Sequence, residues 1–217
     1  MKIYYCVVSV LTRKTFRYRI YPDADQAARL DQWSDTLRLL WNLANEQRLL
    51  GLARSRDERR YYSAFDQINE LKDLRAEFPW FADVPRNACA ELLIVLDRSW
   101  RRCFRKTAGR PRWKRKGVDR VVLCEPHSKS WKLEDGRLVF PKVGNMRVSQ
   151  HRPLEGRPKT CSIVRDVDQW FVVISCEVEV RDVASANQSV VGIDRGCVNV
   201  VADSDGNLTP NPRFSEL

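Results

Sequence analysis

Residues 190–196 form the stretch VVGIDRG, in which a run rich in valine and isoleucine delivers one carboxylate, Asp194, two residues before a glycine. The apolar residues predict a buried strand, and Gly196 predicts a turn. Residues 197–202 are expected to form a second strand that ends at the turn sequence DSDG at 203–206, a pattern typical of a β-hairpin. Because hard divalent cations bind carboxylate oxygens, this hairpin is predicted to present Asp194 as a metal ligand.

Two interpretations of Asp194 are open at this point. An aspartate between a strand and a glycine is more often only a turn residue. An aspartate on the first strand of a hairpin is also similar to the RNase H/RuvC nuclease core, where carboxylates hold the cations that bind the attacking and leaving oxygens of a phosphodiester. The rest of the sequence has to distinguish the two.

The charge of the chain favours a polyanionic partner. The 217 residues include 38 lysines and arginines and 28 aspartates and glutamates, a formal net charge of +10. Such a charge favours nucleic acid through counterion release. An anionic membrane is the alternative, but no apolar run approaches the roughly 20 residues that span a bilayer, and no signal-peptide pattern is present. We therefore expect a globular, cytoplasmic protein of one large or two small domains without a membrane partner.

The cysteines argue against a zinc site. They form an odd set without a Cys-x-x-Cys pair, and His127 and His151 are the two histidines. No zinc-ribbon spacing can be assembled from these residues, so we predict no structural zinc. Their apolar or mixed surroundings predict buried free thiols. The cysteines are Cys6, Cys89, Cys103, Cys124, Cys161, Cys176 and Cys197.

The first part of the chain predicts a strand and then three helices. Residues 16–21 alternate apolar positions with Arg17 and Arg19, which indicates a half-buried strand with one basic face. Asp23 and Gln26 have the spacing of a capping box at the start of a helix that is expected to reach about Leu52. The apolar stripe of this helix is Leu30, Trp33, Leu37, Trp41 and Ala44.

Two further amphipathic helices are expected, one from about Asp57 to Phe78, closed by Pro79, and one from about Pro85. Together the three helices predict a small bundle. They are longer than those of helix-turn-helix DNA readers, and none has a clear recognition face. The stripe of the second is Tyr61, Phe65, Ile68, Leu71 and Phe78; that of the third is Ala88, Leu92, Val95, Leu96, Trp100 and Cys103 or Phe104.

A strongly basic segment follows at residues 98–120, where Asp119 is the one acidic residue. Glycines and a proline break the helix, so the segment is predicted to be a basic helix end followed by an extended arm. A solvated charged surface is the alternative. The one-sided charge and the interleaved aromatic residues favour nucleic-acid contact, because arginine pairs with phosphate and aromatic rings stack on bases. The candidate binding residues are Arg17, Arg19, Arg98, Arg101, Arg102, Arg105, Lys106, Arg110, Arg112, Trp113, Lys114, Arg115, Lys116 and Arg152.

After Val118 the pattern changes to short strands. This spacing predicts a small antiparallel barrel or sandwich. The strand at 16–21 is expected to pair with it, which makes the helices an insertion, and residues 181–189 are expected to be a linker. The expected strands are residues 121–123, 130–133, 137–140, 146–149, 160–165 and 170–180.

Several short stretches occur in one order along the chain. They are FRYRIYP at 16–22, LWN at 40–42, PRWK at 111–114, PKVG at 141–144, HRPLEG at 151–156, VGIDRG at 191–196, SDG at 204–206 and NPR at 211–213. In this order they resemble the N-terminal half of the OrfB/TnpB proteins of bacterial insertion sequences, transposase-associated, compact relatives of type V CRISPR effectors. The ordered set is specific and covers nearly the whole chain.

The resemblance implies a fold, partners and a cofactor. It implies an α+β protein in which a β-barrel wedge domain (1–22 and 109–183) contains an inserted helical recognition lobe (23–108) and precedes the first strands of a RuvC/RNase H-like domain (189–217). It also implies a guide RNA that pairs with target DNA, while the protein recognises backbone shape and a short flanking DNA motif. Asp194 matches the family's first catalytic aspartate, and Mg²⁺ belongs to a complete site.

The family's second and third carboxylates and its zinc ribbon are not found before Leu217. Two-metal chemistry needs several carboxylates, so we expect a truncated protein that binds nucleic acid, holds a cation weakly at Asp194 and does not cleave DNA alone. Asp203 and Asp205 are expected to serve only the turn. One alternative is half of a split or self-associating metal-dependent DNA endonuclease, completed by a downstream fragment. Others are an RNA-independent DNA-binding regulator and a pseudogene product without a role.

Overall fold

The computed structural model describes residues 9–118, 122–181 and 191–212. The predictions that concern residues 1–8, Val121, the linker up to Val190 and Arg213 lie outside the described residues. The chain divides into two compact units, one of residues 11–180 and a second formed by residues 1–10 and 181–217.

The described part of the chain from Ser9 to Arg181 forms one strand, then four helices, then six further strands. The helices are α1 (Ala24–Ala53), α2 (Ala64–Glu77), α3 (Pro79–Asp83) and α4 (Arg86–Phe104). The strands are β1 (Ser9–Tyr21), β2 (Leu123–Glu125), β3 (Lys132–Glu134), β4 (Arg137–Phe140), β5 (Gly144–Ser149), β6 (Arg157–Asp166) and β7 (Gln169–Arg181). The predicted α+β class is confirmed.

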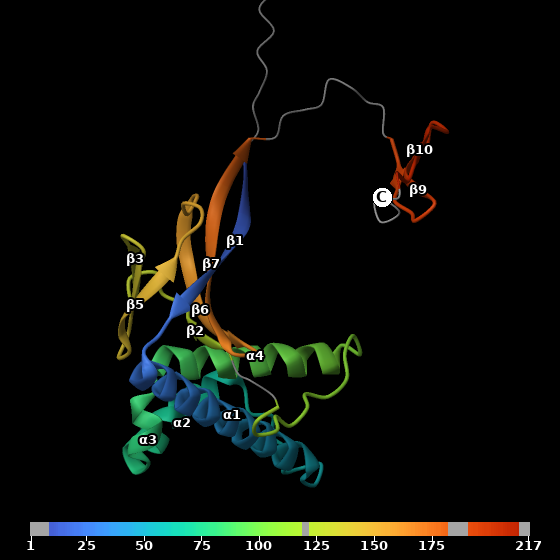
Figure 1. Cartoon of the computed structure of the whole chain (residues 1–217). Coiled ribbons are helices and arrows are strands. Elements are labelled where there is room, and N and C mark those ends of the chain that lie inside the picture. The colour runs from blue at the N-terminus through green and yellow to red at the C-terminus, as the bar shows by residue number, and fades with distance from the viewer. Residues whose placement is uncertain (1–8, 119–121, 182–190, 213–217) are drawn as a thin grey trace, which may run out of the picture. The chain divides into compact units, whose positions relative to one another are not determined.

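The seven strands form one sheet in the order β2-β6-β7-β1-β5-β4-β3. Figure 1 shows this sheet curled, with the helices gathered at one end. β1 lies between β7 and β5, so the strand that precedes the helices pairs with strands that follow them, as predicted. Among the described residues the edge strands β2 and β3 do not pair with each other, so the predicted barrel is present as an open, curled sheet.

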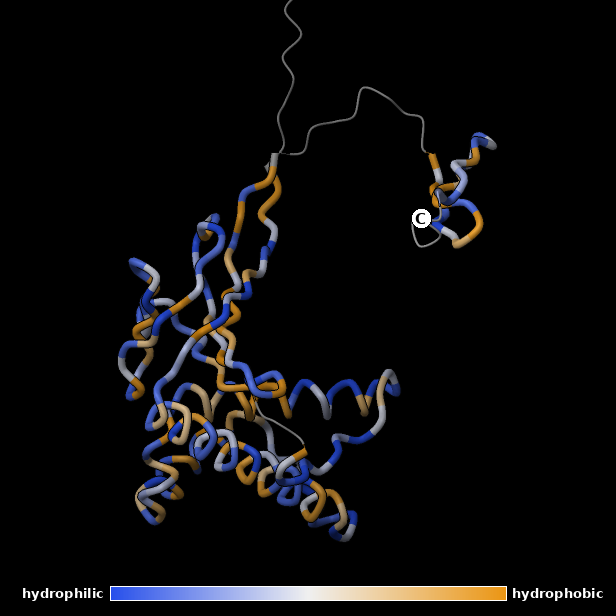
Figure 2. The backbone as a smooth tube through the Cα atoms, in the orientation of Figure 1, coloured by the Kyte–Doolittle hydropathy of each residue, from blue (hydrophilic) through white to orange (hydrophobic). Residues whose placement is uncertain are grey.

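Strict alternation of side chains explains the two faces of the sheet. On β1, Phe16, Tyr18 and Ile20 are at most 2% exposed, whereas Arg17 and Arg19 between them are exposed. Successive side chains of a strand point to opposite faces, so one face joins the core and the other carries charge. Figure 2 shows hydrophobic and hydrophilic segments interspersed along the strands and helices.

The turn between β3 and β4 follows the chemistry of its sequence. Asp135 and Gly136 have φ angles of 48° and 68°. Glu134 pairs with Arg137 directly beside this two-residue connection. A two-residue hairpin turn that matches the strand twist needs positive φ at both central residues, which Asp-Gly tolerates.

Helix α1 begins and packs as predicted. The Asp23 side chain accepts a hydrogen bond from the Gln26 backbone N–H (2.8 Å), and the Gln26 side chain accepts one from the Asp23 backbone N–H (3.1 Å). Both bonds satisfy donors that a helix start leaves unpaired. All five residues of the predicted stripe are buried.

The second predicted helix begins later than expected and ends where expected. α2 begins at Ala64 rather than near Asp57, because Ser63 caps it and the Asp66 side chain accepts from the Ser63 backbone N–H (2.8 Å). Phe65, predicted as core, is 73% exposed. α2 ends at Glu77, before Pro79 as predicted, and Pro79 opens the further short helix α3, where its missing N–H costs nothing.

The helices and the cysteines agree in large part with what the sequence predicts. No helix within the described residues is long and apolar enough to cross a membrane. Cys89, Cys161 and Cys176 are buried free thiols, as predicted, whereas Cys197 is exposed. Burial raises the pKa of the Cys89 thiol to about 11.

A buried arginine joins the helices through polar contacts. Arg48 of α1 has 0% exposure, and its guanidinium donates to the side-chain oxygen Oε1 of Gln67 on α2 from Nε (2.9 Å) and Nη2 (2.7 Å). Its Nη1 donates to the Tyr61 hydroxyl (3.0 Å) and to Asp97 Oδ1 of α4 (3.2 Å). Because a buried charge is tolerated only when it is paired and hydrogen-bonded, these contacts fix α1, α2 and α4 against one another.

The Asp97 carboxylate is the acceptor at the centre of this cluster. Its Oδ1 accepts from the Tyr61 hydroxyl (2.7 Å) and the Ala64 N–H (3.2 Å), and its Oδ2 accepts from Arg101 Nε (2.6 Å). Burial opposes ionisation of Asp97, but the hydrogen bonds from Tyr61 and Arg101 and the charge of Arg48 outweigh it and lower its pKa. Burial and the bond to Asp97 raise the pKa of Tyr61 to about 12.

We predict that Asp97→Asn lowers the free energy of unfolding by about 3–5 kcal/mol at pH 7, because it leaves the buried Arg48 without its counterion. A carboxyl with a depressed pKa contributes its stability above its ordinary pKa of about 4, and the contribution is lost as pH falls through the folded-state pKa. Denaturant unfolding at pH 7 and pH 3 should show the difference between variant and wild type shrinking in acid.

The matched control is Asp73→Asn, at an exposed position of α2. It should change the free energy of unfolding by less than about 0.5 kcal/mol. Equal effects of the two substitutions would contradict the role given to Asp97.

Candidate nucleic-acid interface and carboxylate hairpin

Side chains of α1 hold the backbone of the basic arm (residues 109–118). Trp41 Nε1 donates to the Arg112 carbonyl (3.0 Å). Asn42 donates to the Lys114 carbonyl (2.9 Å) and accepts from the Lys114 N–H (2.8 Å). Asn45 donates to the Pro111 carbonyl (3.3 Å). The LWN and PRWK stretches of the sequence are therefore two sides of one contact, and the arm is fixed rather than loose.

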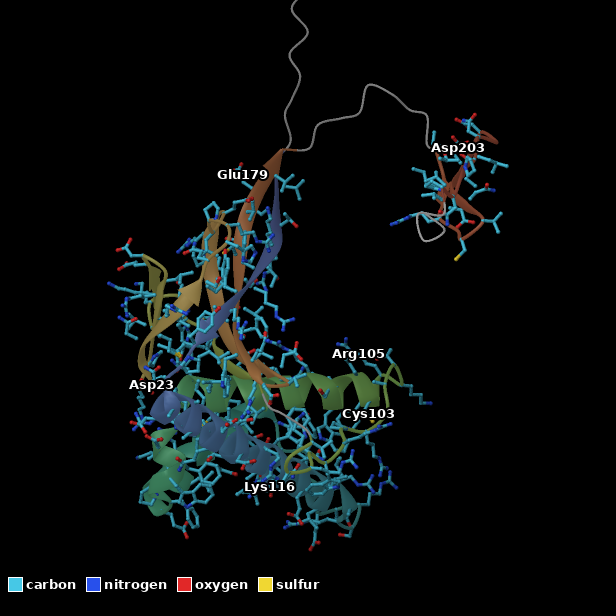
Figure 3. All side chains as sticks on the ribbon, in the orientation of Figure 1. Asp23, Cys103, Arg105, Lys116, Glu179 and Asp203 are labelled. Carbon is cyan, nitrogen blue, oxygen red and sulfur yellow. The ribbon has the colours of Figure 1, made fainter. Side chains whose placement is uncertain are left out.

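Fixing the backbone directs most of the arm's charged side chains into solvent. Arg110, Arg112 and Lys116 are exposed. Trp113 is 48% exposed. Lys114 is half-buried, with its Nζ 4.9 Å from the centre of the Trp41 ring. Figure 3 shows Lys116 on the arm and Arg105 at the end of α4, the two basic parts of this surface.

The predicted binding cations differ in whether a carboxylate already engages them. Arg101 is paired with Asp97 (2.6 Å), Arg98 lies 3.8 Å from Glu91, and Lys116 lies 4.0 Å from Asp35. Five exposed cations of the basic segment form no ion pair with another described residue. They are Arg102, Arg105, Lys106, Arg110 and Arg112. These five carry the positive field of the surface.

An apolar groove of about 540 Å³ lies where the ends of α1 and α4 meet the basic arm. Trp113 and Phe104 line it, each about half exposed at 48% and 50%. Arg110 and Glu46 supply its charged lining. Exposed aromatic faces beside cations are suited to stacking an unpaired base. Sequence reasoning noted Trp113 but placed Phe104 in the core as one option, because helical periodicity does not show where a helix leaves its neighbours.

The predicted binding residues of the sheet are partly engaged within the protein. Arg17 pairs with Asp166 (2.6 Å) and lies 3.8 Å from the centre of the Phe171 ring. Arg19 lies 5.1 Å from the centre of the Tyr21 ring. The guanidinium of Arg152 lies 4.9 Å from the centre of the buried Phe16 ring. The Arg152 side chain is nevertheless exposed.

The turn after Arg152 requires a glycine. Gly156 has a φ of 77°, and a Cβ there would lie 2.3 Å from the Glu177 carbonyl oxygen of β7. Only a residue without a side chain permits this approach. The HRPLEG stretch thereby places its backbone beside β1, where the Tyr18 hydroxyl donates to the Arg152 carbonyl (3.1 Å).

The second unit contains the hairpin predicted around Asp194. Its strands are β8 (Ile193–Asp194), β9 (Asn199–Asp203) and β10 (Leu208–Pro210), in the order β10-β9-β8. Asp194 pairs with Ala202, and its side chain is exposed. The expectation of a buried strand is wrong for the described residues, since Val191 and Ile193 are 45% and 68% exposed. None of the described residues of this unit forms a second layer over them.

The carboxylate of Asp203 serves the turn, as predicted. Oδ1 accepts from the N–H groups of Asp205 (3.0 Å) and Asn207 (2.8 Å), and Oδ2 accepts from the Asn207 side chain (2.7 Å). These bonds, that of the Asn207 side chain first, lower the pKa of Asp203. Figure 3 labels Asp203 in this hairpin. Asp194 is therefore the candidate metal ligand there, and within the described residues no three His, Cys, Asp or Glu side chains cluster around it.

Comparison with known proteins gives one family match and two relatives. The OrfB/IS605-type family model, described as a helix-turn-helix domain, matches residues 12–49. In the structure these residues are most of β1 and most of the single helix α1. Two relatives carry the name "Putative RNA-guided DNA endonuclease": InsQ of Escherichia coli K12, 24% identical over 90% of this chain, and a protein of Streptomyces pristinaespiralis, 27% identical over 93%. The chain spans about half the length of these curated relatives, 48% and 50% respectively.

Asn42→Ala is predicted to loosen the basic arm. The variant loses both hydrogen bonds to the backbone of Lys114, and each such bond contributes about 0.5–1.5 kcal/mol. Local opening should therefore rise about tenfold, and trypsin should cleave within residues 110–116 correspondingly faster. Limited digestion followed by mass spectrometry measures the rate at each site.

The neighbouring Leu43→Ala is the control, because Leu43 is 42% exposed and lines a pocket with residues of α1, α2 and α4 rather than of the arm. Its cleavage rate in the arm should equal that of wild type. Wild-type rates in Asn42→Ala would mean that the arm is held by other contacts.

Proposed function

We propose that the chain is a protein of the OrfB/TnpB family and that its 217 residues bind a guide RNA and the DNA that the guide recognises. The observation that carries the proposal is the basic arm, whose backbone is held by α1 while Arg110 and Arg112 are exposed and form no ion pair within the described residues. A binding surface that is already ordered loses less conformational entropy when a ligand binds.

Phosphate recognition is assigned to the arm and the end of α4. Arginine presents a planar fork of donors that matches phosphate oxygens, and each neutralised phosphate releases counterions. Arg102, Arg105, Lys106, Arg110 and Arg112 would supply these contacts. Base pairing between guide and target carries the sequence specificity, so the protein needs to recognise backbone rather than bases.

The apolar groove is assigned a second role in the same recognition. Where a paired region ends, an unstacked base needs a surface that replaces its lost neighbour. Trp113 and Phe104 offer half-exposed rings for that purpose, and Arg110 lies in the same lining to contact the adjoining phosphate. Stacking of this kind contributes about 1–3 kcal/mol per base and tolerates any base.

Cleavage is assigned to a nuclease site of which these residues supply only the first part. We propose that β8 and β9 open a RuvC-like nuclease domain and that Asp194 is its first metal-binding carboxylate. Mg²⁺ bound in the complete site would stabilise the attacking and leaving oxygens of a phosphodiester. One exposed carboxylate holds Mg²⁺ weakly, because the ion gives up water reluctantly. The 217 residues alone should therefore bind nucleic acid without cutting it, and the remaining carboxylates would come from another segment or another copy.

Alanine substitution of Arg105, Arg110 and Arg112 is predicted to flatten the salt dependence of RNA binding. Each lost phosphate contact should reduce the slope of log K against log salt by about 0.7 for a single strand and about 0.9 for a duplex. Fluorescence anisotropy between 50 and 300 mM salt measures the slope. Lys72→Ala with Arg86→Ala, at exposed positions of α2 and α4 away from the arm, is the control and should leave the slope unchanged. An unchanged slope in the triple variant would mean that the arm is merely solvated.

Asp194→Ala is predicted to leave RNA and DNA binding within about twofold of wild type, because one carboxylate contributes nothing to phosphate contact. The wild-type chain should show no Mg²⁺-dependent DNA cleavage alone. Cleavage should appear when a fragment that carries the family's remaining carboxylates is added, and Asp194→Ala should abolish it. Cleavage by the 217 residues alone, lost in Asp194→Ala, would refute the assignment of an incomplete site.

A further inference from the structure

Two arginines share one aromatic ring on the exposed face of the sheet. The guanidinium carbon of Arg147 on β5 lies 4.4 Å from the centre of the Tyr21 ring, and that of Arg19 on β1 lies 5.1 Å from the same ring. The strand register explains the arrangement, since Tyr21 pairs with Arg147 and Arg19 pairs with Ser149. Tyr21 is 38% exposed, so the ring and both cations are open to solvent.

A third arginine extends this cluster across the next strand. Arg137 of β4 pairs directly with Arg147 and is exposed on the same face. Like charges opposite each other destabilise a sheet. The carboxylate nearest in register is Glu134, which pairs with Arg137 across the β3–β4 turn. No ion pair within 4.0 Å joins Glu134 to Arg137 in the part of the chain that the structure describes, and Arg19 and Arg147 have none either.

Other cations of β1 are arranged differently. Lys14 pairs with Glu155 (2.6 Å) and Arg17 pairs with Asp166 (2.6 Å). The sheet thus neutralises Lys14 and Arg17 with carboxylates of its own, whereas it leaves Arg19, Arg137 and Arg147 together around Tyr21. A fold that accepts a local electrostatic cost at one place commonly does so for a ligand.

We propose that Arg19, Arg137 and Arg147 form a second phosphate-binding site, which contacts the sugar-phosphate backbone of the bound nucleic acid. The inference rests on the proposed function, because it supposes that the chain binds nucleic acid. Neighbouring strands lie about 4.8 Å apart, so side chains from β1, β5 and β4 can converge on one or two adjacent phosphates. The Tyr21 ring restrains two guanidiniums before binding, which reduces the entropy that they lose.

The location separates this site from the basic arm. The arm is held by side chains of α1, whereas the three arginines lie on the strands β1, β5 and β4 of the sheet. Two sites on one rigid unit can fix the direction of a nucleic-acid strand, which a single basic patch does not. The ligand class is a phosphodiester, and RNA and DNA are its two sources.

The test compares three variants of the full 217-residue chain. Arg19→Gln with Arg147→Gln removes the two cations of the Tyr21 ring. Lys14→Gln, on the same strand, is the control, because its charge is already paired with Glu155 and it is not among the candidate binding residues. Arg19→Lys with Arg147→Lys keeps the charges and loses the planar forks. Circular dichroism and thermal unfolding confirm that each variant is folded.

Binding is measured with single-stranded poly(U) RNA and with a DNA duplex of equal length, each between 50 and 300 mM salt. The Gln pair should weaken binding about tenfold or more at 50 mM salt and reduce the salt slope by about 1.4–1.8, two contacts at about 0.7–0.9 each. Lys14→Gln should stay within about twofold of wild type. The Lys pair should recover most of the slope. A loss confined to RNA or to DNA would support the site and identify which strand occupies it.

Two results would overturn the inference. Wild-type affinity and slope in the Gln pair, together with a reduced slope in the Arg105, Arg110 and Arg112 variant, would remove the sheet site and leave the proposed function standing. An equal loss in Lys14→Gln would show a diffuse field rather than a built site. Wild-type behaviour of both the Gln pair and the arm variant would refute the proposed function itself.

Discussion

The charge of Arg48 is the constraint on which the recognition surface depends. An arginine with no exposed surface must find its partners inside the protein, and here they come from α2, α4 and the segment before α2. Satisfying that one guanidinium fixes three helices at once. The same Asp97 also holds Arg101 on the surface, so the interior cluster reaches the basic end of α4.

Helix α1 carries this order to both basic surfaces. Near its start, Gln26 donates to the carbonyls of Val143 (3.3 Å) and Asn145 (3.1 Å), and Arg29 donates to that of Lys142 (2.7 Å). Farther along, Trp41 and Asn42 hold the basic arm. The arm and the sheet therefore share one rigid reference, within the unit of residues 11–180. A surface that is placed this way can discriminate the shape of a nucleic-acid backbone.

The sequence predicted the parts that depend on local pattern. Alternation located β1 and β4, and the Asp23 and Gln26 spacing located the start of α1, because each follows from neighbours along the chain. The Arg48 cluster was not predictable, since its partners lie 13 to 49 residues away. Phe65 shows the opposite error: a periodic position was taken as core although nothing packs on it. In the candidate site, the sequence predicted the cations. It did not predict that α1 fixes the backbone of the arm, or that Lys14 and Arg17 of β1 pair with carboxylates of the protein.

The position of β1 has a consequence for how the protein is made. β1 comprises the first described residues of the chain, yet it is the central strand, with β7 on one side and β5 on the other. On the ribosome, β1 emerges before its neighbours β5 and β7, which follow more than a hundred residues later in the sequence. In that interval α1 to α4 can already assemble around Arg48. Pairings so distant in sequence form slowly, and an unpaired strand with an apolar face is prone to aggregation. The yield of folded protein should therefore depend more on how well chaperones protect β1 during synthesis than on the stability of the finished fold.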